Sequence, residues 1–430
     1  MIAKLLNQYL FPIISPAFDG FLSSSMTSRC LIIFLLGWFI AFWINKFSRY
    51  LASLFDLEVR NFNGQSPEEH TASIRRVPIW ETWFLTPLYG VFLSGIYFWL
   101  TVRLGVNSGL FRNVNPSLIP PEYPLLVLRE FIGIFIFFGF LLAASIIDIR
   151  RKIIPDWITF PGTIVGLLLA GSFLSIQIPI QYLIHDETGN LCIAPTIAGL
   201  HFASPYAWPI WSTQIQGLLA GLGCWLLWMF ALLRRSWYTR HGYGRAIALC
   251  WARIRRDPST RIIGWIALIG IIYIIFCWQY ANSEYCYLLS SLIGMAGGGF
   301  MIWLVRVIGR FSLRKESMGF GDVTLMSLIG AYCGWQATIV IFFLSPLTAL
   351  FVGILMIVLK NDRLVPFGPF LCLGTVLWIL FFPFIWSQFG FLVFSLGGGC
   401  IWGILIVCLI LMGLLLTIYR RLVQCLLYKK

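Results

Sequence analysis

The chain has 430 residues, of which 59% are hydrophobic and only 11% are charged, and its mean hydropathy is +0.85. Soluble domains are nearer one-half apolar, so this composition excludes an ordinary soluble domain and indicates a protein that crosses a membrane many times. The net charge of +14 does not indicate nucleic-acid binding, because the basic residues form short clusters between apolar runs and not one continuous stripe.

Apolar runs that could cross about 30 Å of hydrocarbon recur along the whole chain. They lie at 30–44, 83–102, 125–147, 158–176, 210–233, 262–280, 287–308, 323–334, 336–359, 367–385 and 391–418. The eighth run, 323–334, is unusually short. The sequence therefore predicts an all-α fold, a polytopic transmembrane helical bundle of about eleven spans.

The basic residues predict how these spans are oriented. If the spans alternate in direction and the tail lies inside, the cytoplasmic segments are 46–82, 148–157, 234–261, 306–322, 360–366 and 419–430. All but five of the 31 lysines and arginines then face the cytoplasm, the exceptions being Lys4, Arg29, Arg103, Arg112 and Arg129. This asymmetry is typical of cytoplasmic loops and supports the assignment.

Two acids stand at the predicted cytoplasmic ends of spans. Asp148 closes the third span, and Asp322 opens the eighth directly after Gly319-Phe320-Gly321. An ionisable residue beside the hydrocarbon suggests a functional site. Because both acids lie on the same predicted side, they can meet at one membrane depth although they are far apart in the sequence.

Simpler roles are open for each acid. Asp322 follows a glycine at a helix start, where a carboxylate caps the helix and complements its dipole. Asp148 stands at a helix end, where it can pair with Arg151 or Lys152 at the interface. Asp156 follows Pro155 at the start of the fourth span and is interpreted as a structural N-cap.

Two carboxylates in a partly dry site share one proton, which is the requirement for aspartic proteolysis. The ionised acid activates a water that attacks the scissile carbonyl, and the protonated acid donates to the developing oxyanion. No metal is needed. Ser/His/Asp chemistry is disfavoured, because the four histidines all fall in connecting segments: His70, His185, His201 and His241.

Three motifs resemble those of a known family. Asp148-Ile-Arg-Arg-Lys-Ile-Ile-Pro155-Asp156 and Met318-Gly-Phe-Gly-Asp322, the second followed by Gly330-Ala-Tyr-Cys-Gly334-Trp335, resemble the active-site segments of prepilin leader peptidases, GxGD-type aspartic proteases of the cytoplasmic membrane. Val365-Pro366-Phe367-Gly368-Pro369-Phe370-Leu371 is similar to a third segment, and Arg76-Val-Pro78-Ile-Trp-Glu81 is a weaker match to a fourth.

The resemblance covers roughly residues 76–176 and 287–385. It implies that Asp148 and Asp322 are the catalytic pair. The residues it implies as active-site support are Gly319, Gly321, Pro155, Asp156, Pro366, Phe367, Gly368 and Pro369. The glycines around Asp322 would allow a tight turn and the close approach of a substrate chain.

The chain departs from the family pattern in one cytoplasmic segment. Bifunctional members carry two C-x-x-C pairs there, which bind zinc and are associated with methylation of the new N-terminus. Residues 45–80 contain no cysteine. N-methylation is therefore not expected, nor are zinc or S-adenosylmethionine as cofactors.

A second departure is an insertion at 177–286, with an outer loop, two extra spans and a basic cytoplasmic loop at 234–261. Because the number of added spans is even, every later segment stays on the side of the membrane that it would otherwise occupy. The basic loop is interpreted as an anchor to anionic lipid headgroups, with docking of pilus or secretion assembly proteins as the alternative. Cys192 and Cys286, on the outer side, are either bridged or free thiols.

The predicted organisation is therefore an N-terminal outer segment with the first span at 1–45, the cysteine-free loop at 46–82, spans with the first acid at 83–176, the insertion at 177–286, spans with the second acid at 287–385, and the last span with a basic tail at 386–430.

The resulting hypothesis is a multi-pass inner-membrane aspartic endopeptidase that removes the short leader from type IV pilin-like or pseudopilin precursors at the cytoplasmic face. The expected partners are that precursor, membrane lipids and assembly proteins. The alternatives are a presenilin-like intramembrane protease, whose Tyr-Asp and Pro-Ala-Leu motifs are missing, a proton-coupled transporter that uses both acids, and a scaffold descended from a peptidase.

Overall fold

The computed structural model describes residues 25–63, 79–104, 123–171, 177–185, 191–199, 210–233, 252, 255–280, 282–313, 318–358 and 366–385, with scattered positions from 403 to 417. The helices are α3 (Met26–Asn63), α4 (Ile79–Leu104), α5 (Tyr123–Arg151), α6 (Asp156–Ala170), α7 (Ile215–Leu232), α9 (Pro258–Tyr280), α10 (Asn282–Leu313), α11 (Phe320–Val358) and α12 (Gly368–Ile385). A short 3₁₀ turn, η5 (Ile210–Ser212), precedes α7.

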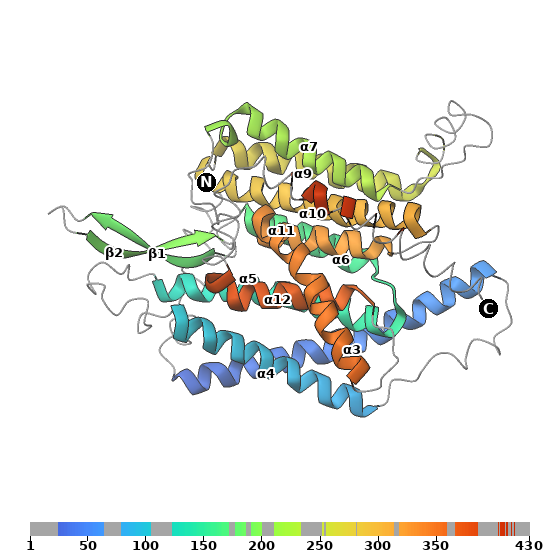
Figure 1. Ribbon diagram of the computed structural model, residues 1–430, viewed down its shortest axis with the longest axis horizontal. Coiled ribbons are helices and arrows are strands. Elements are labelled where there is room, and N and C mark those ends of the chain that lie inside the picture. The colour runs from blue at the N-terminus through green and yellow to red at the C-terminus, as the bar shows by residue number, and fades with distance from the viewer. Residues whose placement is uncertain are drawn as a thin grey trace.

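The helices form a layered bundle. In Figure 1, α7 and α9 lie along one side, α3 and α4 lie on the opposite side, and the other helices pack between them. Within the described residues, six helices are long and apolar enough to cross a membrane, and α6 and most of α12 are shorter apolar helices. The predicted all-α, polytopic fold is confirmed, while the number of eleven spans stays a prediction because 391–418 lies largely outside the described residues.

Several boundaries differ from the prediction. α3 continues to Asn63 and α4 begins at Ile79, so the segment predicted as a loop at 46–82 is helical at both ends. α6 ends at Ala170, earlier than the predicted 176, and its last bond runs from the N–H of Gly171 to the carbonyl of Leu167. The glycine is required by packing, because a Cβ there would overlap the Tyr273 hydroxyl.

A two-stranded hairpin in the insertion was not predicted. β1 (Gln177–His185) pairs antiparallel with β2 (Leu191–Gly199), in a register that places Gln177 opposite Gly199 and His185 opposite Leu191. The hairpin projects from one end of the bundle (Figure 1). It adds a small strand element to an otherwise helical fold.

α10 and α11 pack against each other at glycines, which let the two backbones approach closely. A Cβ atom at Gly294 would lie 2.6 Å from the carbonyl oxygen of Gly330 and 2.6 Å from the carbonyl carbon of Gly334. A Cβ at Gly330 would in turn overlap the backbone of Gly294. Larger residues at these points would force the helices apart, so the small side chains are a packing requirement.

α11 is broken at Gly334, at the predicted boundary between the runs 323–334 and 336–359. Gly334 has φ 76° and ψ 176°, a conformation essentially confined to glycine. Its carbonyl accepts a hydrogen bond of 2.6 Å from Thr338 Oγ1. The break divides α11 into a short first half that begins near Asp322 and a longer second half.

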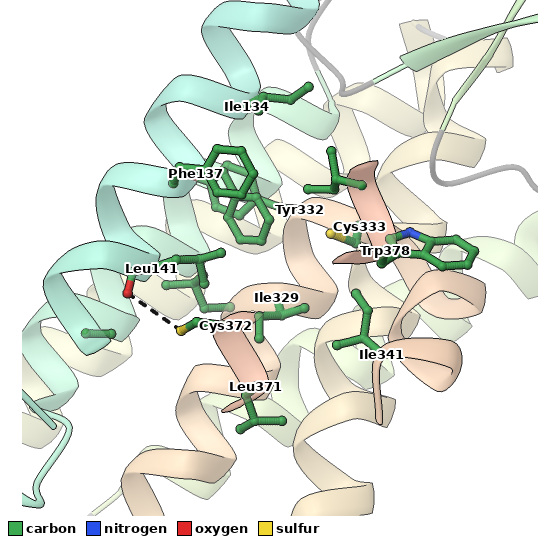
Figure 2. Close-up of a cluster of buried hydrophobic side chains, with 14 of the residues drawn as sticks. Ile134, Phe137, Leu141, Ile329, Tyr332, Cys333, Ile341, Leu371, Cys372 and Trp378 are labelled. Carbon is green, nitrogen blue, oxygen red and sulfur yellow. Dashed lines mark hydrogen bonds between the residues drawn. The ribbon is translucent and has the colours of Figure 1, made fainter. Parts of the chain in front are cut away.

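Two buried clusters hold the bundle together. The first core joins α3, α4, α5, α11 and α12, and includes Phe137, Tyr332 and Trp378. Phe137 and Tyr332 stack with ring centroids 4.4 Å apart (Figure 2). The second core joins α7, α9 and α10 to one face of α6 and α11, and includes Trp225, Trp228 and Leu292.

Candidate active site

Asp148 lies near the C-terminal end of α5 and is only 4% exposed. The helix ends through Lys152, whose φ is 58° and whose N–H donates to the Asp148 carbonyl at 2.7 Å. The Asp148 carboxylate interacts with the backbone N–H of Gly368, and its Oδ2 atom has no hydrogen-bond partner among the described residues. The alternative of an ion pair between Asp148 and Arg151 or Lys152 stays a prediction.

Asp322 is the third residue of α11 and is 9% exposed. Its carboxylate accepts a hydrogen bond from the backbone N–H of Gly319, directly before the helix. This is how an acid at the third helical position completes one half of a capping box, and the helix dipole favours a negative charge there. Asp322 therefore stabilises the helix start from inside the first turn and is not the N-cap itself.

The structure brings the two acids together. Asp148 and Asp322 are near enough for their charges to interact directly, although they belong to α5 and α11. The predicted convergence of the two helix ends is therefore present in the fold. Their catalytic role stays a prediction.

Ile154, in the link between α5 and α6, explains two of the predicted glycines. A Cβ at Gly321 would lie 2.7 Å from the Cβ of Ile154, and a Cβ at Gly368 would lie 2.8 Å from its Cδ1 atom and would overlap Asp148 Oδ2. Gly319 is different, because the nearest atom to its Cβ position is Asp322 Oδ2 at 3.9 Å. Gly321 and Gly368 are required by packing, whereas a Cβ at Gly319 would meet no atom of the described residues closer than 3.9 Å.

The segment 366–369 forms the start of α12 at the same site. The carbonyl of Phe367 accepts hydrogen bonds from the N–H groups of Phe370 and Leu371, at 3.0 and 3.2 Å. Pro369 lies in the first turn, where a missing N–H costs nothing, and Pro366 precedes the helix. This start aims the backbone N–H of Gly368 at Asp148.

The sequence predicts Asp156 as the N-cap of α6, but in the structure Asp156 is the first residue of the helix. The N-cap is Pro155, and no side chain caps the helix there. The fixed φ of proline suits the edge of a helix, and the helix boundary lies one residue earlier than predicted. Asp156 Oδ1 instead lies 3.4 Å from Thr324 Oγ1, on the first turns of α11.

Sequence reasoning missed Cys372, Thr159 and Thr324. Cys372 lies one helical turn beyond Gly368, its Sγ donates to the Leu141 carbonyl at 3.6 Å (Figure 2), and it is close enough to both acids for electrostatic interaction. Thr159 and Thr324 are both buried and bonded to each other. The available signal was the spacing of three or four residues, about one helical turn, from Gly368 to Cys372, from Pro155 to Thr159 and from Gly321 to Thr324.

Other predictions are only partly covered by the described residues. Cys286 is a buried free thiol 3.7 Å from Ser212 Oγ, while the side chain of Cys192 lies outside the described residues. The weaker motif at 76–81 and most of the basic loop at 234–261 also lie outside them. In the described part, no cluster of three or more His, Cys, Asp or Glu side chains suits a metal, and the prediction of no zinc remains untested.

Comparisons with known proteins point to one family. Residues 255–354 match the type IV leader peptidase family, a segment that contains Asp322 but not Asp148. Prepilin leader peptidase/N-methyltransferase from Aeromonas hydrophila is 35% identical over 95 residues, which cover 21% of this chain and 33% of that protein. The protein of the same name from Pseudomonas aeruginosa is 33% identical over 95 residues, again 21% of this chain and 33% of that protein.

A longer match is the Xanthomonas campestris pv. campestris protein of that name, 27% identical over 154 residues, 33% of this chain and 50% of the relative. The chain thus spans between a third and a half of the length of these curated relatives. No solved structure matches it. The chain carries a type IV leader peptidase segment, and its resemblance to prepilin leader peptidases, predicted from the sequence motifs, is confirmed.

Proposed function

We propose that the protein is a membrane aspartic endopeptidase that removes the short leader from type IV pilin-like or pseudopilin precursors at the cytoplasmic face of the inner membrane. The observation that carries the proposal is the convergence of Asp148 and Asp322 at the ends of two different helices. The family match and the Pro-Phe-Gly-Pro start of α12 beside the pair support it.

The chemistry follows from two carboxylates in a largely buried site. Close acids cannot both ionise comfortably, so the pair holds one proton between them. The ionised carboxylate takes a proton from water as the water oxygen attacks the scissile carbonyl, and the protonated one donates to the carbonyl oxygen. The roles then reverse, and the amine leaves with a proton.

The surroundings of the pair suit this exchange. Asp148 Oδ2 is buried and has no protein hydrogen-bond partner among the described residues, so its hydrogen-bonding capacity is left for the shared proton. The lack of a Cβ at Gly319 gives an extended substrate backbone room beside Asp322. The precursor's apolar helix would lie in the bilayer next to α5 and α11, which brings a bond just outside that helix to the acids.

N-methylation is not part of this proposal, because 45–80 lacks the cysteine pairs of the bifunctional family members. A released protein with a free N-terminal amine is expected. Mass spectrometry of the processed precursor tests this directly, and a methylated terminus made by the purified chain would contradict it.

A proton-coupled transporter is the second candidate, and the break in α11 at Gly334 is the observation that favours it. Discontinuous helices and intramembrane acids are common in transporters. The peptidase is preferred because the acids lie at helix ends and because the family match covers the first half of α11.

The decisive experiment is cleavage of candidate pilin-like precursors by the purified full chain in detergent. Asp148→Asn and Asp322→Asn are each expected to lower leader removal by at least about a thousandfold, since the two acids act as one unit. Asp257→Asn is the matched control, because Asp257 belongs to the start of α9, where its Oδ1 accepts hydrogen bonds from the N–H and the hydroxyl of Ser259. Full cleavage by either acid variant would refute the pair.

A further inference from the structure

A buried hydroxyl network joins the start of α6 to the start of α11, two residues from Asp322. Thr159 Oγ1 donates to Thr324 Oγ1 at 3.0 Å. Thr324 Oγ1 lies within donor distance of two acceptors, the Gly321 carbonyl at 3.0 Å and Asp156 Oδ1 at 3.4 Å. Thr159 and Thr324 are 0% and 3% exposed.

The number of protons limits how the network can bond. Each hydroxyl has one hydrogen, and that of Thr159 has two acceptors within reach, Thr324 Oγ1 at 3.0 Å and the Asp156 carbonyl at 3.3 Å. In the arrangement with the shorter bond Thr324 receives this hydrogen, so its own hydrogen is left for Gly321 or Asp156. A carboxylate at the end of such a chain strengthens each bond in it. Asp156 thus serves as the acceptor at the solvent-exposed end of a short relay of hydroxyls that begins inside the bundle.

The network acts on the turn that holds the second acid. Gly321 and Thr324 flank Asp322 in the first turns of α11, and Gly321 packs against Ile154 in the link before α6. Losing the hydroxyl of Thr324 would leave the hydroxyl of Thr159 and the carboxylate of Asp156 to find other partners. The first turn of α11 would then be held to α6 by shape alone.

We propose that Thr324 and Thr159, with Asp156 as the terminal acceptor, are positioning residues that hold Asp322 at the distance from Asp148 needed for a shared proton. The inference rests on the proposed peptidase function. None of the three touches the reacting bond, because they lie on the α6 side of the first turn of α11 and bond to each other and to Gly321.

The test is steady-state leader removal by purified Thr324→Val, which keeps the shape and removes the hydroxyl. We expect kcat to fall between about tenfold and a hundredfold, because displacement of a catalytic group by about 1 Å has an effect of that order. KM should change by less than about threefold. Thr324→Ser should restore kcat to within about threefold of the original protein, which a purely structural role would not require.

Further variants separate the network from general packing. Thr159→Val should resemble Thr324→Val, and the double variant should be no slower than the slower single one, because both break the same network. Ser327→Ala is the matched control, since Ser327 is buried on the same helix but bonds only to the Val323 carbonyl, at 3.1 Å. It should keep kcat within about twofold.

Hydrogen exchange gives a readout without precursor. The first turns of α11 should exchange at least about tenfold faster in Thr324→Val than in the Ser327→Ala control. Unchanged exchange, or kcat within twofold of the original protein in Thr324→Val, would overturn the inference. Failure of the peptidase proposal itself is distinguishable, because the original protein would then remove no leader, and failure of the acid pair would leave leader removal intact in Asp148→Asn and Asp322→Asn.

Discussion

The first and second cores differ in how they treat their buried polar groups. In the second core, Trp225 Nε1 donates to the Ala267 carbonyl at 3.0 Å and Tyr285 donates to the Gly217 carbonyl at 2.9 Å. In the first core, the Tyr332 hydroxyl, Trp378 Nε1 and Asp148 Oδ2 have no partner among the described residues. Buried polar groups are normally bonded, so the exceptions gather in the core that contains the acid pair.

The difference indicates that the second core serves stability, while the first core carries the proposed site. The inserted helices α7 and α9 complete the second core with stacked rings, such as Phe160 and Trp228 at 5.3 Å, and leave an apolar outer face that includes Trp265 and Ile269. α11 is shared by both cores, because Ala331 belongs to the second core and the adjacent Tyr332 to the first. The inserted helices can therefore support α11 without contacting the acids.

Apart from the acids themselves, the largest effect is expected in the first core, from Gly368→Ala. The new methyl group would overlap Asp148 Oδ2 and lie 2.8 Å from Ile154 Cδ1, so the acid must move. Leader removal should fall about a hundredfold, because small displacements of a catalytic group are costly. Gly139→Ala on α5 is the control, since its Cβ would meet nothing within 4 Å. Equal activity of the two variants would contradict the packing role of Gly368.

A substitution in the second core should lower the stability of the protein and leave leader removal unchanged. Trp228→Ala removes a side chain that is 5% exposed and stacked on Phe160, which should lower the free energy of unfolding in detergent by about 3–5 kcal/mol. Leader removal by the folded fraction, assayed well below the unfolding transition, should stay within about twofold. Leu227→Ala, at a position that is 58% exposed, is the control and should change stability little. Loss of kcat in Trp228→Ala would show that the two cores are coupled.

The smallest effect is expected at the link between α5 and α6. Lys152 is the one non-glycine residue with positive φ in the described part of the chain, and the left-handed conformation costs a side chain on the order of 1 kcal/mol. Lys152→Gly should raise the free energy of unfolding by about that amount. Arg151→Gly, one residue earlier in the helix, should lower it by up to about 1 kcal/mol. Thermal unfolding of both variants in detergent measures the difference, and a destabilised Lys152→Gly would show that the lysine side chain contributes more than the strain costs.

The sequence predicted the parts of the site that depend on span order and motif. Apolar periodicity and the basic loops placed Asp148 and Asp322 on one side of the bundle, and the short run 323–334 anticipated the break in α11 at Gly334. These features are set locally, by hydrocarbon length and by the glycine conformation. The helical bundle and the convergence of the two acids could therefore be predicted from the sequence.

Features that depend on contacts between distant segments were not predictable. Thr159 and Thr324 are 165 residues apart, and a threonine in an apolar helix gives no sign of whether it bonds to its own helix or to another. Cys372 was overlooked because it belongs to no cysteine pair. The β1–β2 hairpin was missed because its apolar alternation is interrupted by Pro179 and Pro195, which argue against strands in a sequence.

Two helices that begin at the site are too short to match a bilayer. α6 has 15 residues, and the half of α11 before its break, from Phe320 to Cys333, is of similar length, so each is only about 21–22 Å long at 1.5 Å per residue. Hydrocarbon about 30 Å thick must thin around such helices or admit water at their ends. In the proposed peptidase, such thinning would bring water to a peptide bond next to a lipid-embedded anchor, without the anchor having to leave the bilayer.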